Sequence, residues 1–180
     1  MKNNNISKII NNIKLIVSDV DGVLTDGKLL ISSDNTESKF FSVEDATGVA
    51  LANYANLPIA LISGRYSTTT EIRAKELRIE YCYQGILDKK NKLLELLKIY
   101  DVKLNEVAYI GDSLVDIPVL EMVGLPISVP NAHNKAKDIS LIITDKCGGE
   151  GVLFEVIEKI LINQGRYSEV LNIMKEDKFD

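Results

Sequence analysis

Residues 13–24, with the sequence IKLIVSDVDGVL, constrain the fold more than any other stretch of the chain. The apolar run that ends at Ser18 is typical of a buried strand in a parallel sheet. Two carboxylates, Asp19 and Asp21, follow it directly. In an open α/β sheet, ligands bind outside the carboxyl ends of the strands. Because two acids at such an edge repel each other, we expect a cation beside them.

Strand and helix patterns alternate along the rest of the chain. Strands are predicted at 57–62, 79–83, 107–110, 126–129 and 141–143, and helices at 45–56, 67–77, 88–100, 113–123 and 150–163. This alternation predicts an α/β fold with a Rossmann-like parallel sheet and right-handed crossovers. Segments 28–32 and 37–43 interrupt it as a β-hairpin around the turn residues 33–36. The 180 residues suit a single domain, with residues 1–12 frayed or in a short helix and residues 167–180 as a polar tail.

Composition narrows the class of protein and its partners. Hydrophobic residues make up 46% of the chain and charged residues 26%, which is typical of a soluble globular protein. The net charge of -5 disfavours nucleic acid or an anionic membrane as a partner. No apolar run is long enough for a membrane span, and the first twelve residues lack the apolar core of a signal peptide, so we expect a cytoplasmic protein. Cys82 and Cys147 lie far apart, and we expect free thiols.

Three predicted strands end at residues with chemistry in common, namely Asp19, Ser63 and Asp112. A carboxylate can accept a phosphoryl group and form an aspartyl phosphate. Such a site needs a hard cation that reduces the repulsion between the carboxylate and a dianionic phosphate ester. Mg²⁺ suits this role because it binds carboxylates, waters and phosphate oxygens. Asp19 and Asp112 can supply the carboxylates. Asp21 is then free to protonate the leaving oxygen and later to activate water.

Two further groups are needed at this edge. Ser63, beside the flexible Gly64, can donate its hydroxyl and nearby N–H groups to phosphate oxygens. A lysine is needed to offset negative charge in the transition state, and Lys89 and Lys90 are both candidates. Each motif alone has a simpler interpretation, as surface acids, a turn or a helix cap. Their joint occurrence, each after a strand, favours catalysis.

Four motifs together carry a family resemblance: DVDGVLTDG, ISGR, YQGILDK and YIGDSLVD. Over about residues 13–166 the chain resembles the haloacid dehalogenase phosphatase superfamily, and within it the phosphatases of 2-keto-3-deoxy sugar acids. The resemblance implies Asp19 as nucleophile, Asp21 as acid/base, and Ser63 as phosphate ligand. It implies Lys89 rather than Lys90 as the motif lysine. It places Mg²⁺ on Asp19, Asp112 and the backbone carbonyl of Asp21.

The resemblance also implies an architecture and a substrate. It implies no separate cap domain, and a homotetramer in which a neighbouring subunit helps to close the active site and the hairpins lie in the interface. The expected substrate is the eight-carbon sugar acid phosphate 3-deoxy-D-manno-octulosonate 8-phosphate. The alternatives are a nine-carbon sugar acid 9-phosphate and a non-catalytic oligomerisation module of the same fold. The complete set of site residues argues against the module.

Several residues depart from the pattern or stay open. Glu44, Ala46 and Ser113 stand where such enzymes often have arginine, glycine and aspartate, so the choice of sugar acid stays open. Asp116 lies either close to the metal ligands or on a helix surface. Two arginines, Arg65 and Arg73, either recognise the substrate carboxylate and hydroxyls or are ordinary helix-surface residues. The sole histidine, His133, receives no role.

Overall fold

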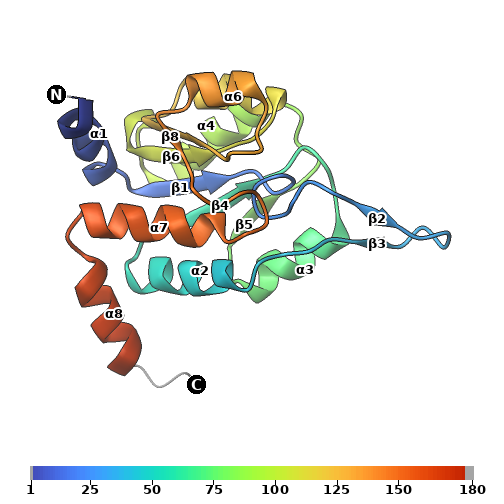
Figure 1. The fold of residues 1–180 in the computed structure, drawn as a ribbon, viewed down its shortest axis with the longest axis horizontal. Helices are drawn as coiled ribbons and strands as arrows, with labels where there is room; N and C mark the ends of the chain where they lie inside the picture. Colours follow the sequence, from blue (N-terminus) through green and yellow to red (C-terminus); the bar gives the residue numbers. More distant parts are fainter. Residues whose placement is uncertain (1, 177–180) are drawn as a thin grey trace.

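The computed structural model describes residues 2–176 and follows the expected alternation of strands and helices (Figure 1). The strands are β1 (Leu15–Ser18), β2 (Leu30–Ile31), β3 (Glu37–Ser38), β4 (Ile59–Ile62), β5 (Tyr81–Tyr83), β6 (Val107–Ile110), β7 (Leu125–Ser128) and β8 (Ile142–Ile143). The helices are α1 (Lys2–Asn11), α2 (Glu44–Tyr54), α3 (Thr68–Glu76), α4 (Lys89–Tyr100), α5 (Ile117–Leu120), α6 (Asn134–Ile139), α7 (Val152–Asn163) and α8 (Tyr167–Glu176). Two short 3₁₀ turns, Leu104–Glu106 and Leu114–Asp116, complete the set.

The first strand of the chain lies at the centre of the sheet. The six-stranded sheet has the order β5-β4-β1-β6-β7-β8, and every neighbouring pair is parallel. Ile16 pairs with Ile59 on one side and with Ala108 on the other. All four residues of β1 are buried, as the apolar run predicts. Because the strands run in one direction, the segments after β1, β4 and β6 meet at one edge.

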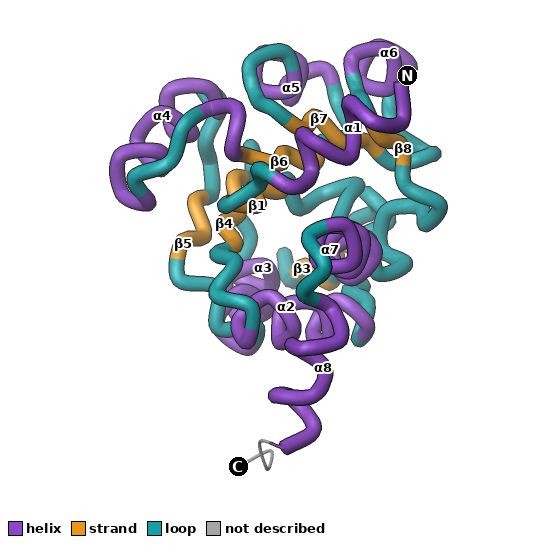
Figure 2. The backbone as a smooth tube through the Cα atoms, turned by 90° about the vertical axis from the view of Figure 1, so that its left-hand side faces the viewer, coloured by secondary structure: helices purple, strands orange, loops and turns teal. Residues whose placement is uncertain are grey.

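Helices cover both faces of this sheet. Figure 2 shows α4, α5 and α6 on one face and α2, α3 and α7 on the other. Helix α7 is strongly amphipathic and buries six apolar side chains: Val152, Leu153, Val156, Ile157, Ile160 and Leu161. At about 1.5–3 kcal/mol for each fully buried large apolar side chain, this face is a major source of stability.

Local capping explains where the two helices nearest the site begin. The Ser67 hydroxyl accepts a hydrogen bond from the Thr70 amide, and Asp88 accepts one from the Asn91 amide. Such caps satisfy amide groups that have no partner inside the helix. Helix α3 therefore starts after Ser67, as expected, and α4 starts with Lys89.

The hairpin projects away from the sheet (Figure 1). Leu30 pairs with Ser38, and Ile31 with Glu37, in an antiparallel ribbon that is shorter than expected. Leu30 and Ile31 are 60% and 62% exposed, so little packing extends the pairing. Within residues 2–176 no other insertion stands between β1 and α2. The expected fold class, a Rossmann-like sheet with a hairpin and no cap domain, is confirmed.

Some segments differ from the expected pattern. The start of the chain forms helix α1, the second of its two expected states, whereas the expected polar tail forms helix α8, in which Val170 is buried. Residues 177–180 of that tail lie outside the described residues. The helix expected at 113–123, interrupted or started near Pro118, is a 3₁₀ turn followed by the short α5, whose first turn contains Pro118. Helix α6 was not predicted. No helix within residues 2–176 has the length and apolar character needed to cross a membrane.

Candidate active site

Lys89 is a buried cation at the carboxyl edge of the sheet. Its ammonium nitrogen lies 2.7 Å from Asp19 Oδ2 and 2.7 Å from Asp116 Oδ1. Burial works to lower the pKa of Lys89, but the two carboxylates outweigh it and raise that pKa. Lys90, the neighbouring candidate, is exposed. The structure thus brings Lys89, and not Lys90, to the acids after β1.

Asp116 is the acceptor around which this cluster is arranged. Its Oδ1 accepts hydrogen bonds from Lys89 Nζ at 2.7 Å and from the Tyr109 hydroxyl at 2.6 Å. Its Oδ2 accepts from the Asp112 and Ser113 amides and from the Ser113 hydroxyl. Asp116 is fully buried. The interpretation of Asp116 as a helix-surface acid is therefore wrong.

Asp19 and Asp112 are the other two carboxylates of the cluster around Asp116. Burial raises the pKa of Asp19 to about 7, with a further contribution from the charge of Asp116 and an opposing one from Lys89. Burial also raises the pKa of Asp112 to about 6, again with a contribution from Asp116. Asp112 Oδ1 is buried and has no hydrogen-bond partner. An unpaired buried carboxylate oxygen is costly, so this corner of the site suits a cation.

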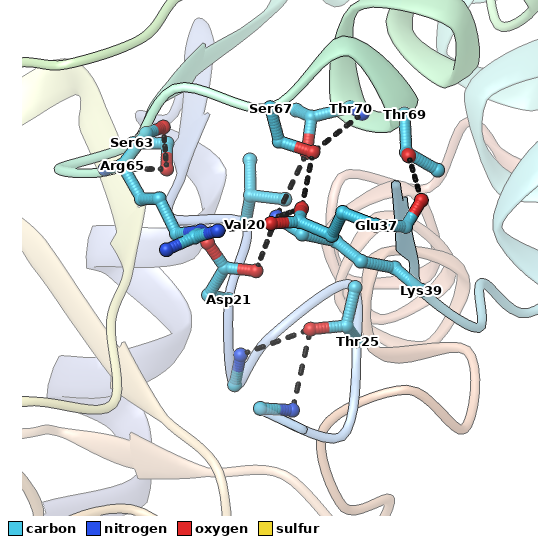
Figure 3. A network of polar contacts seen from close by, with 12 residues as sticks. Val20, Asp21, Thr25, Glu37, Lys39, Ser63, Arg65, Ser67, Thr69 and Thr70 are labelled. Carbon is cyan, nitrogen blue, oxygen red and sulfur yellow. Dashed lines mark hydrogen bonds and ion pairs between the residues drawn. The ribbon is translucent and has the colours of Figure 1, made fainter. Parts of the chain in front are cut away.

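Three carboxylates approach one another at this edge, namely the two expected as metal ligands, Asp19 and Asp112, and that of Asp116. Oxygens of Asp19, Asp112 and Asp116 lie within 4.8 Å of one another. The Asp21 side chain, in contrast, lies against Lys39, with 2.6 Å between Asp21 Oδ1 and Lys39 Nζ (Figure 3). Donors already surround Asp116. Asp112 Oδ1 has no partner, and each Asp19 oxygen has a single contact, Oδ1 with the Val20 amide and Oδ2 with Lys89, so Asp19 and Asp112 keep the capacity to bind a cation.

Glycines allow three loops to approach at this edge. Gly22 has a φ of +94°, and a Cβ there would lie 2.2 Å from Asp112 Oδ2. A Cβ on Gly148 would lie 1.9 Å from the carbonyl oxygen of Gly22. Neither position has room for a larger residue, so the loop after β8 packs directly on the loop after β1. The amide of His133 donates to the Asp112 carbonyl at 2.7 Å and supports the loop after β6 from behind.

Ser63 follows β4 at the same edge and is buried. Its hydroxyl donates to the Arg65 carbonyl at 3.0 Å, and its backbone is held by Tyr83 and Ile86. Gly64 follows in an open position, because a Cβ there would meet only a carbonyl oxygen at 3.8 Å. Ser63 and Gly64 therefore present a short polar turn beside the acids.

The two arginines are held by other protein groups. Arg65 is exposed and forms an ion pair with Glu37 of β3. Arg73 donates to the Ser42 carbonyl at 2.8 Å and pairs with Glu76 at 2.9 Å. Arg65 lies in the same polar network as Asp21 (Figure 3), whereas Arg73 ties α3 to the segment before α2.

Sequence reasoning missed two polar residues of this cluster. Tyr109 sits in an apolar strand, where its hydroxyl is the signal that a buried acceptor is near. Lys39 lies in the hairpin segment, which the sequence predicted to pack through its apolar residues. No local sequence pattern predicted that the Lys39 side chain is buried. Asp116 was marked only by its spacing from Asp112.

A parallel α/β sheet that gathers two buried acids, a buried lysine and a Ser-Gly turn at its carboxyl edge defines a haloacid dehalogenase-like hydrolase. The model of that family matches residues 82–156, and the chain belongs to the family.

Named relatives point to one group within it. The chain is 37% identical over 158 residues to the 3-deoxy-D-manno-octulosonate 8-phosphate phosphatase KdsC of Salmonella typhi, covering 88% of this chain and 84% of the relative. The Moraxella catarrhalis phosphatase of the same name, solved with magnesium, phosphate and KDO, superposes with a TM-score of 0.91 at 38% identity, covering 95% of this chain and 98% of that one. A cobalt-bound form of the Haemophilus influenzae phosphatase gives a TM-score of 0.85 at 34% identity, covering 89% and 94%.

Proposed function

We propose that the protein hydrolyses the phosphate monoester of a 2-keto-3-deoxy sugar acid, 3-deoxy-D-manno-octulosonate 8-phosphate, in a single domain spanning residues 1–180. The observation that carries the proposal is the buried Lys89 held between Asp19 and Asp116, beside a carboxylate oxygen of Asp112 that has no partner. The relatives of that name and their coverage of the chain support the choice of substrate.

Two expectations from the sequence are confirmed at the level of the family. The enzyme class is that of a phosphoric monoester hydrolase. The cofactor is Mg²⁺, which a solved relative holds together with phosphate. The carboxylate donors found at the sheet edge suit this ion, since Mg²⁺ prefers hard oxygen ligands.

Asp19 and Asp112 would hold the ion through their carboxylates, and Asp21 through its backbone carbonyl. Bound there, Mg²⁺ supplies positive charge that offsets repulsion between the site acids and the phosphate dianion. This assignment leaves the Asp21 carboxylate outside the metal site, in agreement with its contact to Lys39. Asp116 keeps its role as acceptor for Lys89, Tyr109 and the loop after β6.

Hydrolysis then takes two displacements. Asp19 attacks phosphorus, a bond forms from its carboxylate oxygen to phosphorus, and the bond to the sugar oxygen breaks. Asp21 gives its proton to the leaving oxygen. A water then attacks the aspartyl phosphate, Asp21 takes its proton, and Asp19 is released with inorganic phosphate. Each proton that Asp21 donates in the first step returns in the second.

Neighbouring donors hold the phosphoryl oxygens during both steps. Lys89 lies 2.7 Å from Asp19 and can offset charge as it builds up on the transferring group. The Ser63 hydroxyl, which now donates to a carbonyl of its own loop, turns toward a phosphate oxygen, and the Gly64 amide assists. We assign Arg65 and Arg73 to the substrate carboxylate and hydroxyls, which requires Arg65 to exchange its Glu37 partner for the ligand.

A homotetramer completes the proposal. The hairpin segment exposes large apolar side chains, with Leu30 60%, Ile31 62%, Phe40 77% and Val43 82% exposed. Such a concentration is typical of an interaction surface. Light scattering at micromolar concentration is expected to give four times the mass of the chain, and a monomeric mass would contradict the assembly.

Phosphate release from purified protein tests the activity. With Mg²⁺, the eight-carbon sugar acid phosphate should be turned over faster than glucose 6-phosphate, and Asp19→Asn should reduce turnover to background while the far-ultraviolet spectrum stays unchanged. A folded Asp19→Asn protein with substantial turnover would refute the nucleophile. No release from any sugar acid phosphate by the wild type would favour the non-catalytic module.

A nine-carbon sugar acid 9-phosphate is the second candidate because of Glu44. This acid stands where such enzymes often have arginine, and it forms an ion pair with Lys146. The same assay decides between the two sugars. A higher kcat/KM for the nine-carbon compound would replace the first choice.

A further inference from the structure

Lys39 is a buried lysine that the reaction described above does not use. Its side chain is fully buried, although it belongs to a hairpin segment with several exposed neighbours. Its ammonium group lies 2.6 Å from Asp21 Oδ1 and donates to the Thr70 hydroxyl at 3.2 Å (Figure 3). Burying an ammonium group is costly unless it is paired and hydrogen-bonded. The position of Lys39 therefore depends on Asp21 and on helix α3.

Lys39 belongs to a chain of alternating charges. The order is Asp21, Lys39, Glu37 and Arg65, with 3.7 Å between Lys39 Nζ and Glu37 Oε1. Glu37 also accepts a hydrogen bond from the Ser67 hydroxyl at 2.7 Å, which holds the pKa of Glu37 below its usual value. The hydrogen bond between Glu37 and Ser67 thus fixes the hairpin to the start of α3. It also holds Lys39 close to Asp21.

Asp21 has little else to fix its carboxylate. Within residues 2–176, Lys39 is the sole basic residue at ion-pair distance from it, and neither carboxylate oxygen has an aligned hydrogen-bond donor. A side chain held through one oxygen keeps the other free for a proton. Asp21 Oδ2 is that free oxygen here.

We propose that Lys39 is a positioning residue that holds the Asp21 carboxylate in place for proton transfer, so that the hairpin of each subunit completes its own site. The inference rests on the proposed role of Asp21 as acid/base. Without the Lys39 charge, Asp21 and Glu37 would repel each other across the vacated space, and the Asp21 carboxylate would lose its fixed position. A misplacement of about 1 Å can cost about 100-fold in rate.

Lys39→Met tests this role because methionine keeps most of the volume and removes the charge. Lys28→Met, at an exposed lysine of the same hairpin segment, is the matched control. With the sugar acid phosphate, Lys39→Met should lower kcat about 100-fold and leave KM within about twofold, since binding of the phosphate is untouched. In a single turnover, release of p-nitrophenol from its phosphate should fall far less, because that leaving group departs without a proton. The control should match the wild type.

A double-mutant cycle separates positioning from a purely structural role. If Lys39 acts through Asp21, Lys39→Met should cost nothing further in an Asp21→Asn background. A full additional loss, or equal losses with both leaving groups, would overturn the inference. If Lys39→Met does not fold, Thr70→Val replaces it, and a fall in kcat that is absent in the Asp21→Asn background is then required. Failure of the proposed function is a separate result, because the wild type would then release no phosphate from any sugar acid phosphate, or its turnover would survive Asp19→Asn.

Discussion

Replacing Asp116 by asparagine should destabilise the protein more than any surface change of similar size. The carboxylate is fully buried and accepts five hydrogen bonds, two at Oδ1 and three at Oδ2. An amide places an NH₂ group against one of these two sets of donors. If the NH₂ group takes the place of Oδ2, it faces the amide N–H groups of Asp112 and Ser113, which are also donors. If it takes the place of Oδ1, it meets the Lys89 ammonium, which cannot accept a hydrogen bond.

The magnitude follows from the charge that is left behind. Lys89 is 1% exposed and would keep Asp19 alone as its partner. Removing one partner of a buried ion pair costs about 3–5 kcal/mol. We expect the free energy of unfolding of Asp116→Asn to fall by about this amount at pH 7. Turnover should fall too, because Lys89 is no longer held between two carboxylates.

Urea unfolding followed by circular dichroism measures the loss. Glu95→Gln is the matched control. Glu95 pairs with Lys92 on the surface of α4, the helix that carries Lys89, and this exposed ion pair should contribute less than about 1 kcal/mol to the free energy of unfolding. In the double variant with Lys89→Met, much of the Asp116→Asn loss should disappear, because the unpaired charge is gone. An Asp116→Asn protein within about 0.5 kcal/mol of the wild type would refute the reasoning.

Three further predictions concern a glycine contact, a buried acid and the metal. Gly148→Ala should cost about 1–3 kcal/mol in urea unfolding and reduce turnover, because the new Cβ would meet the Gly22 carbonyl at 1.9 Å; unchanged stability would contradict the close approach. Burial raises the pKa of Asp45 to about 6 in the folded protein, so its contribution to stability, complete below about pH 4, is lost as the pH rises through 6. Between pH 4 and 7 the wild type should therefore lose up to about 3 kcal/mol relative to Asp45→Asn, and parallel pH curves would count against the shift. Mg²⁺ at 100 times its Kd should add about 2.7 kcal/mol to the stability of the wild type, seen as a rise in Tm, and Asp112→Asn should lose most of that rise.

Local sequence patterns determined the elements and their order. The apolar run before Asp19 predicted the buried strand β1, and the Ser67 cap predicted the start of α3. The placement of Asp19, Ser63 and Asp112 after β1, β4 and β6 followed from the same patterns, because parallel strands end at one edge. Polar stretches gave weaker signals, and α6 and α8 were missed for this reason. Helix α8 packs against α2 and α7, and these contacts cannot be predicted from the residues of α8 alone.

Only the tertiary structure decided which polar groups are buried together. Lys39 and Thr70 are 31 residues apart in the chain, and Lys89 and Asp116 are 27 apart. Periodicity reports the face of one element and carries no information about a charge that arrives from another. Whether an acid such as Asp116 is a solvated surface group or a buried acceptor depends on those distant partners, because a buried charge is tolerated only where a counter-charge and hydrogen bonds meet it.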